Sequence, residues 1–389
     1  MIIFGKKLKL KSRLKSQLKK LTTPQVKNIL ILEDNGLGDY ILARDFFKYI
    51  KQIKKYENHK IILLAKEDRI DFAKIYDANS IDEFILYKPS LMEQDKLYRK
   101  TFIKQLSNKN ITDIINIGVA HPGIDKEPFA TRYLLKHINA KNKIAHAIYT
   151  DNEKYKKEYN LYTKVIYTTE ETIFEYERNR LFFEKLLGMQ INLTNRTPII
   201  QPTYVFNTNH IGIAPFARWE EKTLDLVDWS KLCNVILEKY PDINLMIFGC
   251  KKDIESANEI YSQIDKKERV INCTAKTSTA ELPNIFASLK CLISTESGPV
   301  HLAHAVGLQT FVVSDGSYYK RFQPYPDKDI VYIYPDGFDK LIPNLNNKII
   351  DKYYFTSGFD VKTIPLAKVI NSFLYNFDAS KPPSSNKSF

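Results

Sequence analysis

The sequence lacks the features that mark several classes of protein. Its four cysteines show neither a CxxC pair nor the spacing of a disulfide framework, which is typical of small buried side chains in a reducing compartment. Its seven histidines are scattered and predict no metal-binding cluster. No apolar run approaches the ~18 residues of a membrane-spanning helix. No apolar segment of about 7–15 residues follows the basic start, so no secretory signal is expected.

Acidic residues are absent from the first 32 positions, which hold nine basic residues. Most of the formal net charge of +13 therefore belongs to this segment. Four leucines recur there at helical spacing: Leu10, Leu14, Leu18 and Leu21. The pattern predicts a basic amphipathic segment over 1–25 that contacts an anionic membrane surface. The alternative is a solvated basic helix that packs on the following domain.

The length and composition indicate a soluble globular protein with two domains. The chain has 389 residues, of which 44% are hydrophobic and 26% are charged. Strand-like and helix-like segments alternate, which predicts an α/β fold with parallel sheets. The expected strands are 26–32, 60–65, 83–87, 111–117, 210–214, 244–248, 270–272, 291–294 and 310–313.

The expected domains are separated by a linker at 192–209, which is rich in Thr, Asn and Pro. We place an N-terminal domain at 26–200 and a C-terminal domain at 208–345. A helical segment at 350–377 is expected to pack back on the N-terminal domain, and 380–389 is expected to be a disordered tail. Because open parallel sheets bind ligands beyond the carboxyl ends of their strands, the turns that follow strands are the candidate sites.

The first such turn is Glu33-Asp-Asn-Gly-Leu-Gly-Asp39. It is a poor dinucleotide fingerprint, because the third glycine would fall at Ile41. Asp39 lies near the start of a helix. It either stabilises that helix end or acts as a general base that removes a proton from an acceptor hydroxyl.

Two further turns belong to the second half. Ala214-Pro-Phe-Ala-Arg-Trp-Glu-Glu-Lys222 carries two cations, Arg218 and Lys222, which suit a phosphate or a solvated loop. Ser294-Thr-Glu-Ser-Gly-Pro-Val-His301 opens a helix whose free N–H groups would form an anion site. Its alternatives are a plain helix cap and buried histidines.

Together the three turns resemble the ADP-heptose:lipopolysaccharide heptosyltransferase family, glycosyltransferase family 9. The resemblance rests on Asn35-Gly-Leu-Gly-Asp39, on Asn272-Cys-Thr-Ala-Lys-Thr-Ser-Thr-Ala-Glu-Leu282 and on Glu296-Ser-Gly-Pro-Val-His-Leu-Ala-His-Ala305. It covers roughly residues 26–326. It implies a GT-B fold, in which two Rossmann-like domains face a cleft, with the acceptor on the N-terminal domain and the nucleotide-sugar on the C-terminal domain.

The resemblance also implies site residues. Asp39 matches the proposed general base and Lys222 the lysine at the donor diphosphate. On the donor side, the expected residues are Lys222, Arg218, Glu296, Ser297, Gly298, His301 and Asp253. Glu296 departs from the family, which usually has Asp there. On the acceptor side, we expect Gly38. The basic residues of 118–147 add His121 and Arg132, whose charges suit a phosphorylated acceptor or simply solvated loops.

The expected reaction is an inverting transfer of a heptose or a related sugar from a nucleotide-sugar, ADP-heptose, to a lipid-linked oligosaccharide: a lipopolysaccharide or lipooligosaccharide core or a similar surface glycan. No metal or other cofactor is expected. The expected location is cytoplasmic, peripheral on the cytoplasmic face of the inner membrane. The alternatives are a UDP- or dTDP-hexose donor, or a non-catalytic envelope-glycan binding protein with a degenerate site. A nucleic-acid partner is not expected, because no aromatic-basic binding motif occurs.

Overall fold

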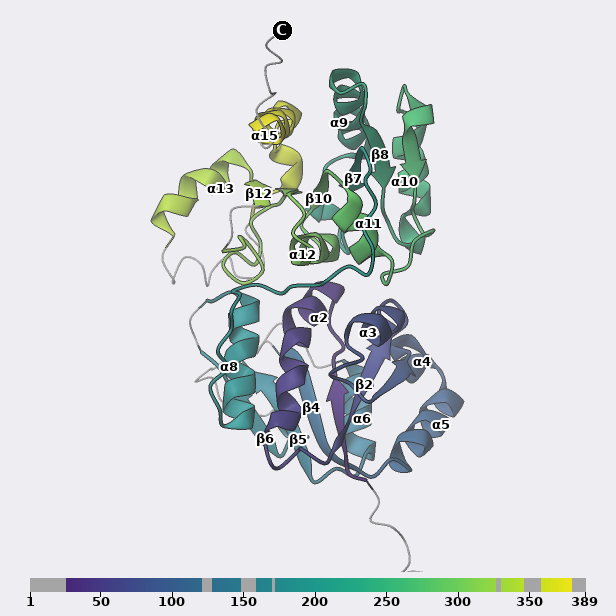
Figure 1. Ribbon diagram of the computed structural model, residues 1–389, viewed down its shortest axis with the longest axis vertical. Helices are drawn as coiled ribbons and strands as arrows, with labels where there is room; N and C mark the ends of the chain where they lie inside the picture. The colour runs from purple at the N-terminus through teal and green to yellow at the C-terminus, as the bar shows by residue number, and fades with distance from the viewer. Residues whose placement is uncertain are drawn as a thin grey trace, which may run out of the picture.

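The computed structural model describes residues 26–120, 128–147, 159–169, 172–326, 330–345 and 358–379. It consists of two α/β domains placed end to end (Figure 1). Each domain is built on a six-stranded sheet whose strands are all parallel. The α/β fold with parallel sheets that the sequence predicts is confirmed. The predicted segments 1–25 and 380–389 lie outside the described residues.

The first sheet has the order β3-β2-β1-β4-β5-β6. Its strands are β1 Asn28–Leu32, β2 Lys60–Lys66, β3 Glu83–Tyr87, β4 Ile111–Ala120, β5 Asn142–Ala147 and β6 Lys164–Tyr167. The helices of this domain are α2 Leu37–Ala43, η1 Arg44–Gln52, α3 Ile70–Tyr76, α4 Pro89–Gln94, α5 Lys96–Ser107, α6 Phe129–His137 and α8 Glu175–Leu187. The sequence did not predict β5 and β6, which are short strands at one edge of the sheet.

The central strand β1 is buried on both faces, which explains why four consecutive apolar residues follow Asn28. Ile29 and Ile31 pack in a cluster with α2, η1 and α8, whereas Leu30 and Leu32 pack with α5 and α6. Successive side chains of a strand point to opposite faces, so this short strand packs against helices on both faces of the sheet. Gly188 ends α8 with a φ of 68°, which suits glycine, and the linker follows.

The second sheet has the order β12-β11-β10-β7-β8-β9. Its strands are β7 His210–Ala214, β8 Asn244–Ile247, β9 Val270–Asn272, β10 Cys291–Thr295, β11 Thr310–Val313 and β12 Ile330–Ile333. The helices are η3 Glu220–Lys222, α9 Leu226–Lys239, η4 Lys251–Asp253, α10 Ile254–Ser262, η5 Lys267–Arg269, α11 Leu282–Ser288, α12 Gly298–Ala305, α13 Asp336–Leu341, η6 Ile342–Asn344, η7 Val361–Thr363 and α15 Leu366–Ala379. The edge strand β12 was not predicted from the sequence.

One apolar cluster is continuous across the domain boundary. It includes residues of α2 and α8 in the first domain and Leu302 and Ala303 of α12 in the second. The side of the second sheet away from the first domain is covered by α9, α10 and α15. The two domains therefore share buried apolar surface in addition to the linker.

The C-terminal helix α15 packs on the second domain, and the expectation that it returns to the first domain is wrong. Val369, Phe373 and Phe377 are buried against Phe311 of β11 and Tyr240 after α9. The amphipathic pattern correctly predicted a buried stripe. It carries no information about which surface that stripe covers. Residues 350–357 of the predicted segment lie outside the described part of the chain.

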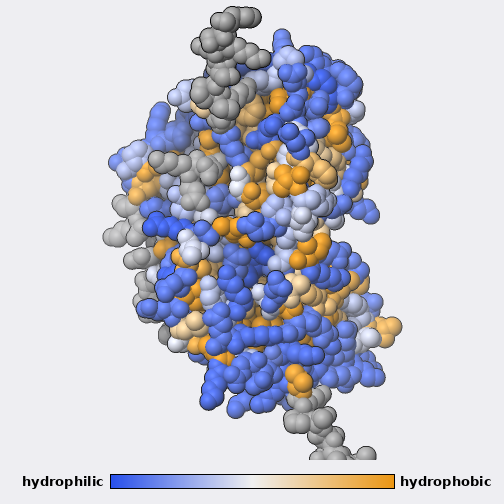
Figure 2. Space-filling view, in the orientation of Figure 1, coloured by the Kyte–Doolittle hydropathy of each residue, from blue (hydrophilic) through white to orange (hydrophobic). Residues whose placement is uncertain are grey.

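Across the described residues, no helix is long and apolar enough to cross a membrane. The face shown in Figure 2 is mostly hydrophilic, with small groups of hydrophobic residues, some of them at the level where the domains meet. Three of the four cysteines, Cys233, Cys273 and Cys291, are buried as predicted, whereas Cys250 is exposed.

Replacing Phe373 with alanine tests the position of α15. The side chain is fully buried, so Phe373→Ala is expected to lower the free energy of unfolding of the second domain by about 3–5 kcal/mol. Tyr375 lies on the same helix with 78% of its surface exposed, and Tyr375→Ala is the matched control. Urea unfolding followed by tryptophan fluorescence measures the effect, since Trp229 is buried in the same cluster. Equal, small losses in both variants would contradict this packing.

Candidate active site at the domain boundary

The three turns singled out in the sequence all follow strands and begin helices. The first joins β1 to α2, the second follows β7 and contains η3, and the third joins β10 to α12. Helices α2 and α12 come from different domains and lie against each other at the boundary (Figure 1). The first and third turns therefore meet, although more than 250 residues separate them in the sequence.

Asp39 is the third residue of α2 and is partly buried. Its carboxylate accepts a hydrogen bond from the backbone N–H of Gly36 at 3.0 Å, so it does stabilise the helix start. Burial raises the pKa of Asp39 above its usual range, while Arg321 and the Gly36 N–H oppose that rise. A carboxylate with a raised pKa accepts a proton more readily, so the helix-capping contact is compatible with a role as a base.

The turn before Asp39 is held by a buried ion pair that the sequence did not reveal. Arg69, at the end of the segment after β2, forms an ion pair with Glu33. Arg69 also donates to the carbonyl oxygens of Asn35 and Gly36, at 3.0 and 3.1 Å. Burial raises the pKa of Glu33 to about 7, with Arg69 opposing the rise. The rule that led to the three turns, polar residues after a strand, would also have marked Arg69.

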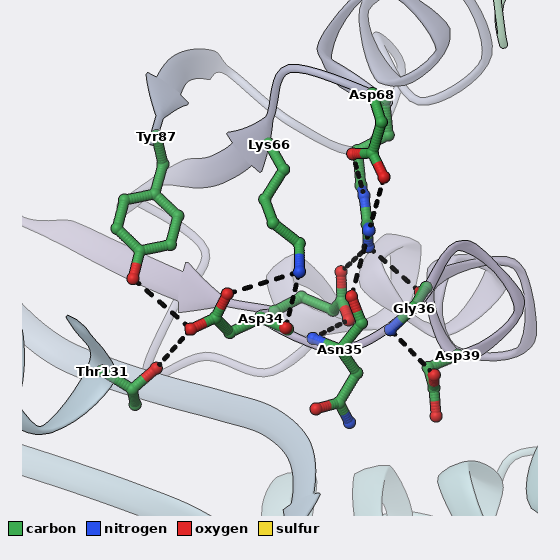
Figure 3. A network of polar contacts seen from close by, with 10 residues as sticks. Asp34, Asn35, Gly36, Asp39, Lys66, Asp68, Tyr87 and Thr131 are labelled. Atoms are coloured by element: carbon green, nitrogen blue, oxygen red, sulfur yellow. Dashed lines mark hydrogen bonds and ion pairs between the residues drawn. The ribbon is translucent and has the colours of Figure 1, made fainter. Parts of the chain in front are cut away.

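A second polar cluster surrounds Asp34 beside this turn (Figure 3). Lys66, at the end of β2, donates to the Asp34 carbonyl at 2.6 Å and pairs with its carboxylate at 3.3 Å. Tyr87, at the end of β3, and Thr131, on α6, donate to the same carboxylate at 3.4 and 3.1 Å. The carboxyl ends of three neighbouring strands thus form one polar floor. Arg132 follows Thr131 on α6 and is exposed.

Gly38 of the first domain lies directly against His301 of the second. A Cβ atom on Gly38 would lie 2.4 Å from His301 Cδ2, a distance that real Cβ atoms essentially never show. His301 Nδ1 is 2.7 Å from the Tyr325 hydroxyl. Burial lowers the pKa of His301 to about 4, so its imidazole is neutral near pH 7. The structure therefore places Gly38, expected on the acceptor side, directly against His301, expected on the donor side.

Lys222 and Glu296 form an ion pair of 2.9 Å between the second and third turns. The Lys222 ammonium group also lies 4.9 Å from the centre of the Tyr318 ring. Burial lowers the pKa of Lys222, but Glu296 and Asp315 outweigh this effect and raise it overall. Lys222 therefore stays charged, and Glu296, the residue that departs from the family pattern, is its direct partner.

The remaining predicted residues have varied surroundings. Ser297 occupies the position before α12, but its hydroxyl donates to the Thr295 carbonyl at 3.3 Å and makes no capping bond. Arg218 is exposed and lies over the Trp219 ring. Asp253 accepts from the backbone N–H of Cys250 at 2.8 Å and so fixes the turn before α10. His121 lies outside the described residues.

A buried ion pair crosses the domain boundary and was missed in the sequence. Glu175, the first residue of α8, pairs with Arg321 of the second domain at 2.8 Å. The backbone N–H of Glu175 also donates to the Arg321 carbonyl at 2.8 Å. Both side chains are buried, and the Arg321 guanidinium lies 4.4 Å from the centre of the Phe322 ring. Phe322 in turn contacts His301, which links this pair to the close approach at Gly38.

The contact between Gly38 and His301 gives a direct test of the domain arrangement. In a helix, alanine is more stable than glycine by about 1 kcal/mol. Because of His301, Gly38→Ala is instead expected to lower the free energy of unfolding by about 1–3 kcal/mol. Adding His301→Ala removes the obstructing ring, so in that background Gly38→Ala is expected to cost nothing or to stabilise. A double-mutant cycle from urea unfolding measures the coupling, and additive effects would show that the two residues are apart in solution.

Comparison with known proteins agrees with this geometry. The sequence model of glycosyltransferase family 9 (heptosyltransferase) matches residues 136–336, more than half of the chain. Lipopolysaccharide heptosyltransferase 1 of Campylobacter coli is 23% identical over 351 residues, which are 86% of this chain and 95% of that protein.

Solved structures of glycosyltransferases have the same fold. The glycosyltransferase family 9 structure from Veillonella parvula DSM 2008 has a TM-score of 0.65 and 17% identity, and covers 92% of this chain and 99% of its own. The E. coli heptosyltransferase WaaC with ADP-2-deoxy-2-fluoro heptose has a TM-score of 0.63 and 14% identity, and covers 90% of this chain and 99% of its own. The predicted GT-B fold is confirmed, and the chain belongs to glycosyltransferase family 9, the heptosyltransferase family.

Proposed function

We propose that this glycosyltransferase moves a heptose from ADP-heptose to a lipopolysaccharide core acceptor, with inversion at the anomeric carbon. The observation that carries the proposal is the meeting of α2 and α12. It places the Asp39 turn of one domain next to the turn of the other domain that holds Glu296, Ser297 and Gly298. A base for the acceptor and a cationic site for the donor thus lie on opposite sides of one boundary.

The donor side is supported by the charge on Lys222 and by the start of α12. Lys222 is buried and charged, and its ion pair with Glu296 holds it beside the third turn. The first backbone N–H groups of a helix favour an anion. A diphosphate between Lys222 and Gly298 would use both. WaaC of E. coli has been solved with ADP and with ADP-2-deoxy-2-fluoro heptose, which supports an adenosine diphosphate donor here.

In the proposed reaction, Asp39 removes the proton from the acceptor hydroxyl as that oxygen attacks the anomeric carbon. The new glycosidic bond forms while the bond to the diphosphate breaks, and the diphosphate takes the electron pair. Lys222 and the N–H groups of α12 stabilise the negative charge on the leaving group. A single displacement inverts the anomeric centre. We propose no metal ion, because protein cations and backbone amides supply this stabilisation.

The acceptor is proposed to bind the first domain. The polar floor around Asp34 and the exposed Arg132 on α6 suit a hydroxylated, anionic oligosaccharide. The name of the Campylobacter coli relative supports a lipopolysaccharide acceptor. Because a lipid-linked acceptor lies in a membrane and the donor is dissolved in water, we propose that the protein works at the cytoplasmic face of the inner membrane. The basic segment 1–25 would make the peripheral contact.

Glu296 keeps two other functions open. Its side chain is longer than the Asp usual in the family and changes the contacts available to the donor sugar. A UDP- or dTDP-hexose is therefore the alternative donor. In their ion pair, its carboxylate also compensates the positive charge of Lys222. If that pair persisted in the presence of nucleotide, the site would bind glycans without catalysis.

Replacing Asp39 with asparagine tests the base. The amide oxygen can still accept from Gly36, so Asp39→Asn is expected to fold and to bind donor, yet to lose transfer by about 100-fold or more. Asp71→Asn, at an exposed carboxylate of α3, is the control. In the wild type, transfer needs ionised Asp39, so activity is expected to fall as the pH drops through the raised pKa. A variant that transfers at the wild-type rate would remove Asp39 from the mechanism.

A thermal-shift panel of ADP, UDP and dTDP tests the donor. ADP is expected to stabilise the protein most, with the same shift in EDTA. Lys222→Met is expected to weaken ADP binding by roughly 10–100-fold, because it removes one charge-assisted hydrogen bond. Lys231→Met, at a 60% exposed position of α9, is the control. A larger shift with UDP or dTDP would favour the alternative donors, and no shift with any nucleotide would favour the glycan-binding protein.

A further inference from the structure

The guanidinium of Arg69 is buried under the turn that carries Asp39. Only 2% of its surface is exposed, although arginine is almost never fully buried unless it is paired. It belongs to the segment between β2 and α3, so it approaches the Asp39 turn from a neighbouring strand. It does not contact Asp39 itself in any hydrogen bond of the described structure.

Arg69 and Glu33 hold the backbone of the turn from both sides. Nη2 of Arg69 donates to the carbonyl of Asn35 at 3.0 Å, and Nη1 donates to the carbonyl of Gly36 at 3.1 Å. One carboxylate oxygen of Glu33 accepts from the backbone N–H of Asn35 at 2.8 Å, and the other pairs with Arg69. Asp68 accepts from Nε at 3.0 Å and fixes the plane of the guanidinium.

These contacts reach the proposed base through Gly36. The N–H of Gly36 donates to the Asp39 carboxylate at 3.0 Å, and the carbonyl of the same residue is one of the two that Arg69 holds. A glycine without such contacts has wide backbone freedom. Figure 3 shows the side chains of Asn35 and Asp39 pointing to the same side of this turn. The orientation of both therefore depends on a backbone fixed by Arg69.

We propose that Arg69, together with Glu33, is a positioning residue for glycosyl transfer, which fixes the Asp39 turn and touches neither substrate. The inference rests on the proposed function of Asp39. The position of Arg69 requires a planar group with several N–H donors, because one side chain must donate to two carbonyl groups and a carboxylate at once. A lysine ammonium has a single nitrogen and does not reproduce this geometry.

Stability alone is a poor explanation for such a pair. Apolar side chains of similar volume often replace a buried ion pair with no loss of stability, because both charges must leave water. Burial raises the pKa of Glu33 to about 7, which shows the cost of keeping this carboxylate in place. What an apolar replacement cannot do is hold two carbonyl groups in a fixed position.

Arg44 provides a matched control in the same domain. It is also buried, pairs with Asp77 at 2.7 Å and donates to the Tyr76 carbonyl at 2.8 Å. The hydrogen bonds of its side chain go to Asp45, Tyr76, Asp77 and Ile199, and none goes to residues 33–39 of the Asp39 turn. Arg44→Met therefore removes a comparable buried charge without releasing Gly36.

The test measures kcat, both KM values and hydrogen exchange in the full-length protein. Arg69→Met is expected to lower kcat by about 100-fold, with the donor KM changed by less than about 3-fold. Arg69→Lys is expected to remain defective. The amides of residues 36–39 are expected to exchange faster in both Arg69 variants. Arg44→Met is expected to lose stability but to keep kcat within about 3-fold of the wild type.

Each outcome decides the inference. A wild-type kcat in Arg69→Met, or an equal loss of kcat in Arg44→Met, would overturn it in favour of a purely stabilising role. If the wild type transfers no heptose, the proposed function fails. Unchanged hydrogen exchange at the amides of residues 36–39 in Arg69→Met would overturn the positioning role by itself. If Arg69→Met does not fold, Glu33→Gln replaces it. The amide keeps the Asn35 contact and removes the ion pair, so kcat is expected to fall by about 10-fold, and an unchanged kcat would count against the pair.

Discussion

The arrangement of the site depends on how closely α2 and α12 approach. A glycine in the first turn of α2 leaves room for the His301 ring, and Gly298 at the start of α12 lies against Leu37 in the same way. Helices that begin with such small residues can bring their first turns together, and the first turns are where the polar groups of a parallel α/β domain gather. The burial that raises the pKa of Asp39 and keeps His301 neutral follows from this contact.

Much of this could be read from the sequence because the signals are local. A buried apolar run followed by a glycine-containing turn predicts a strand and the start of a helix, and it marked the turns of Asp39 and Gly298 correctly. The ion pairs of Glu33 with Arg69 and of Glu175 with Arg321 escaped, since their partners are 36 and 146 residues apart. No local pattern records such a pairing. The predicted position of α15 was wrong for the same reason. An apolar stripe shows which face of a helix is buried, but it does not show which surface covers that face.

Three cations at or beside the site each have a carboxylate partner. Lys222 has Glu296, Arg69 has Glu33, and Lys66 has Asp34, each within the described structure. A buried cation that already has a carboxylate partner can bind a phosphate only if that carboxylate moves away or shares the cation. For Lys222 that carboxylate belongs to Glu296, a residue that departs from the family pattern.

The ion pair of Glu175 and Arg321 has a consequence for motion. Both charged groups are shielded from water while the domains are in contact, and separation would expose them to water. The hydration energy gained would then offset much of the Coulomb attraction lost. The apolar boundary around them gives no such return. The ion pair of Glu175 and Arg321 therefore opposes sliding of one domain along the other more than it opposes their separation. The ion pair thus fixes where the two domains meet, while the apolar cluster that they share supplies the resistance to their separation.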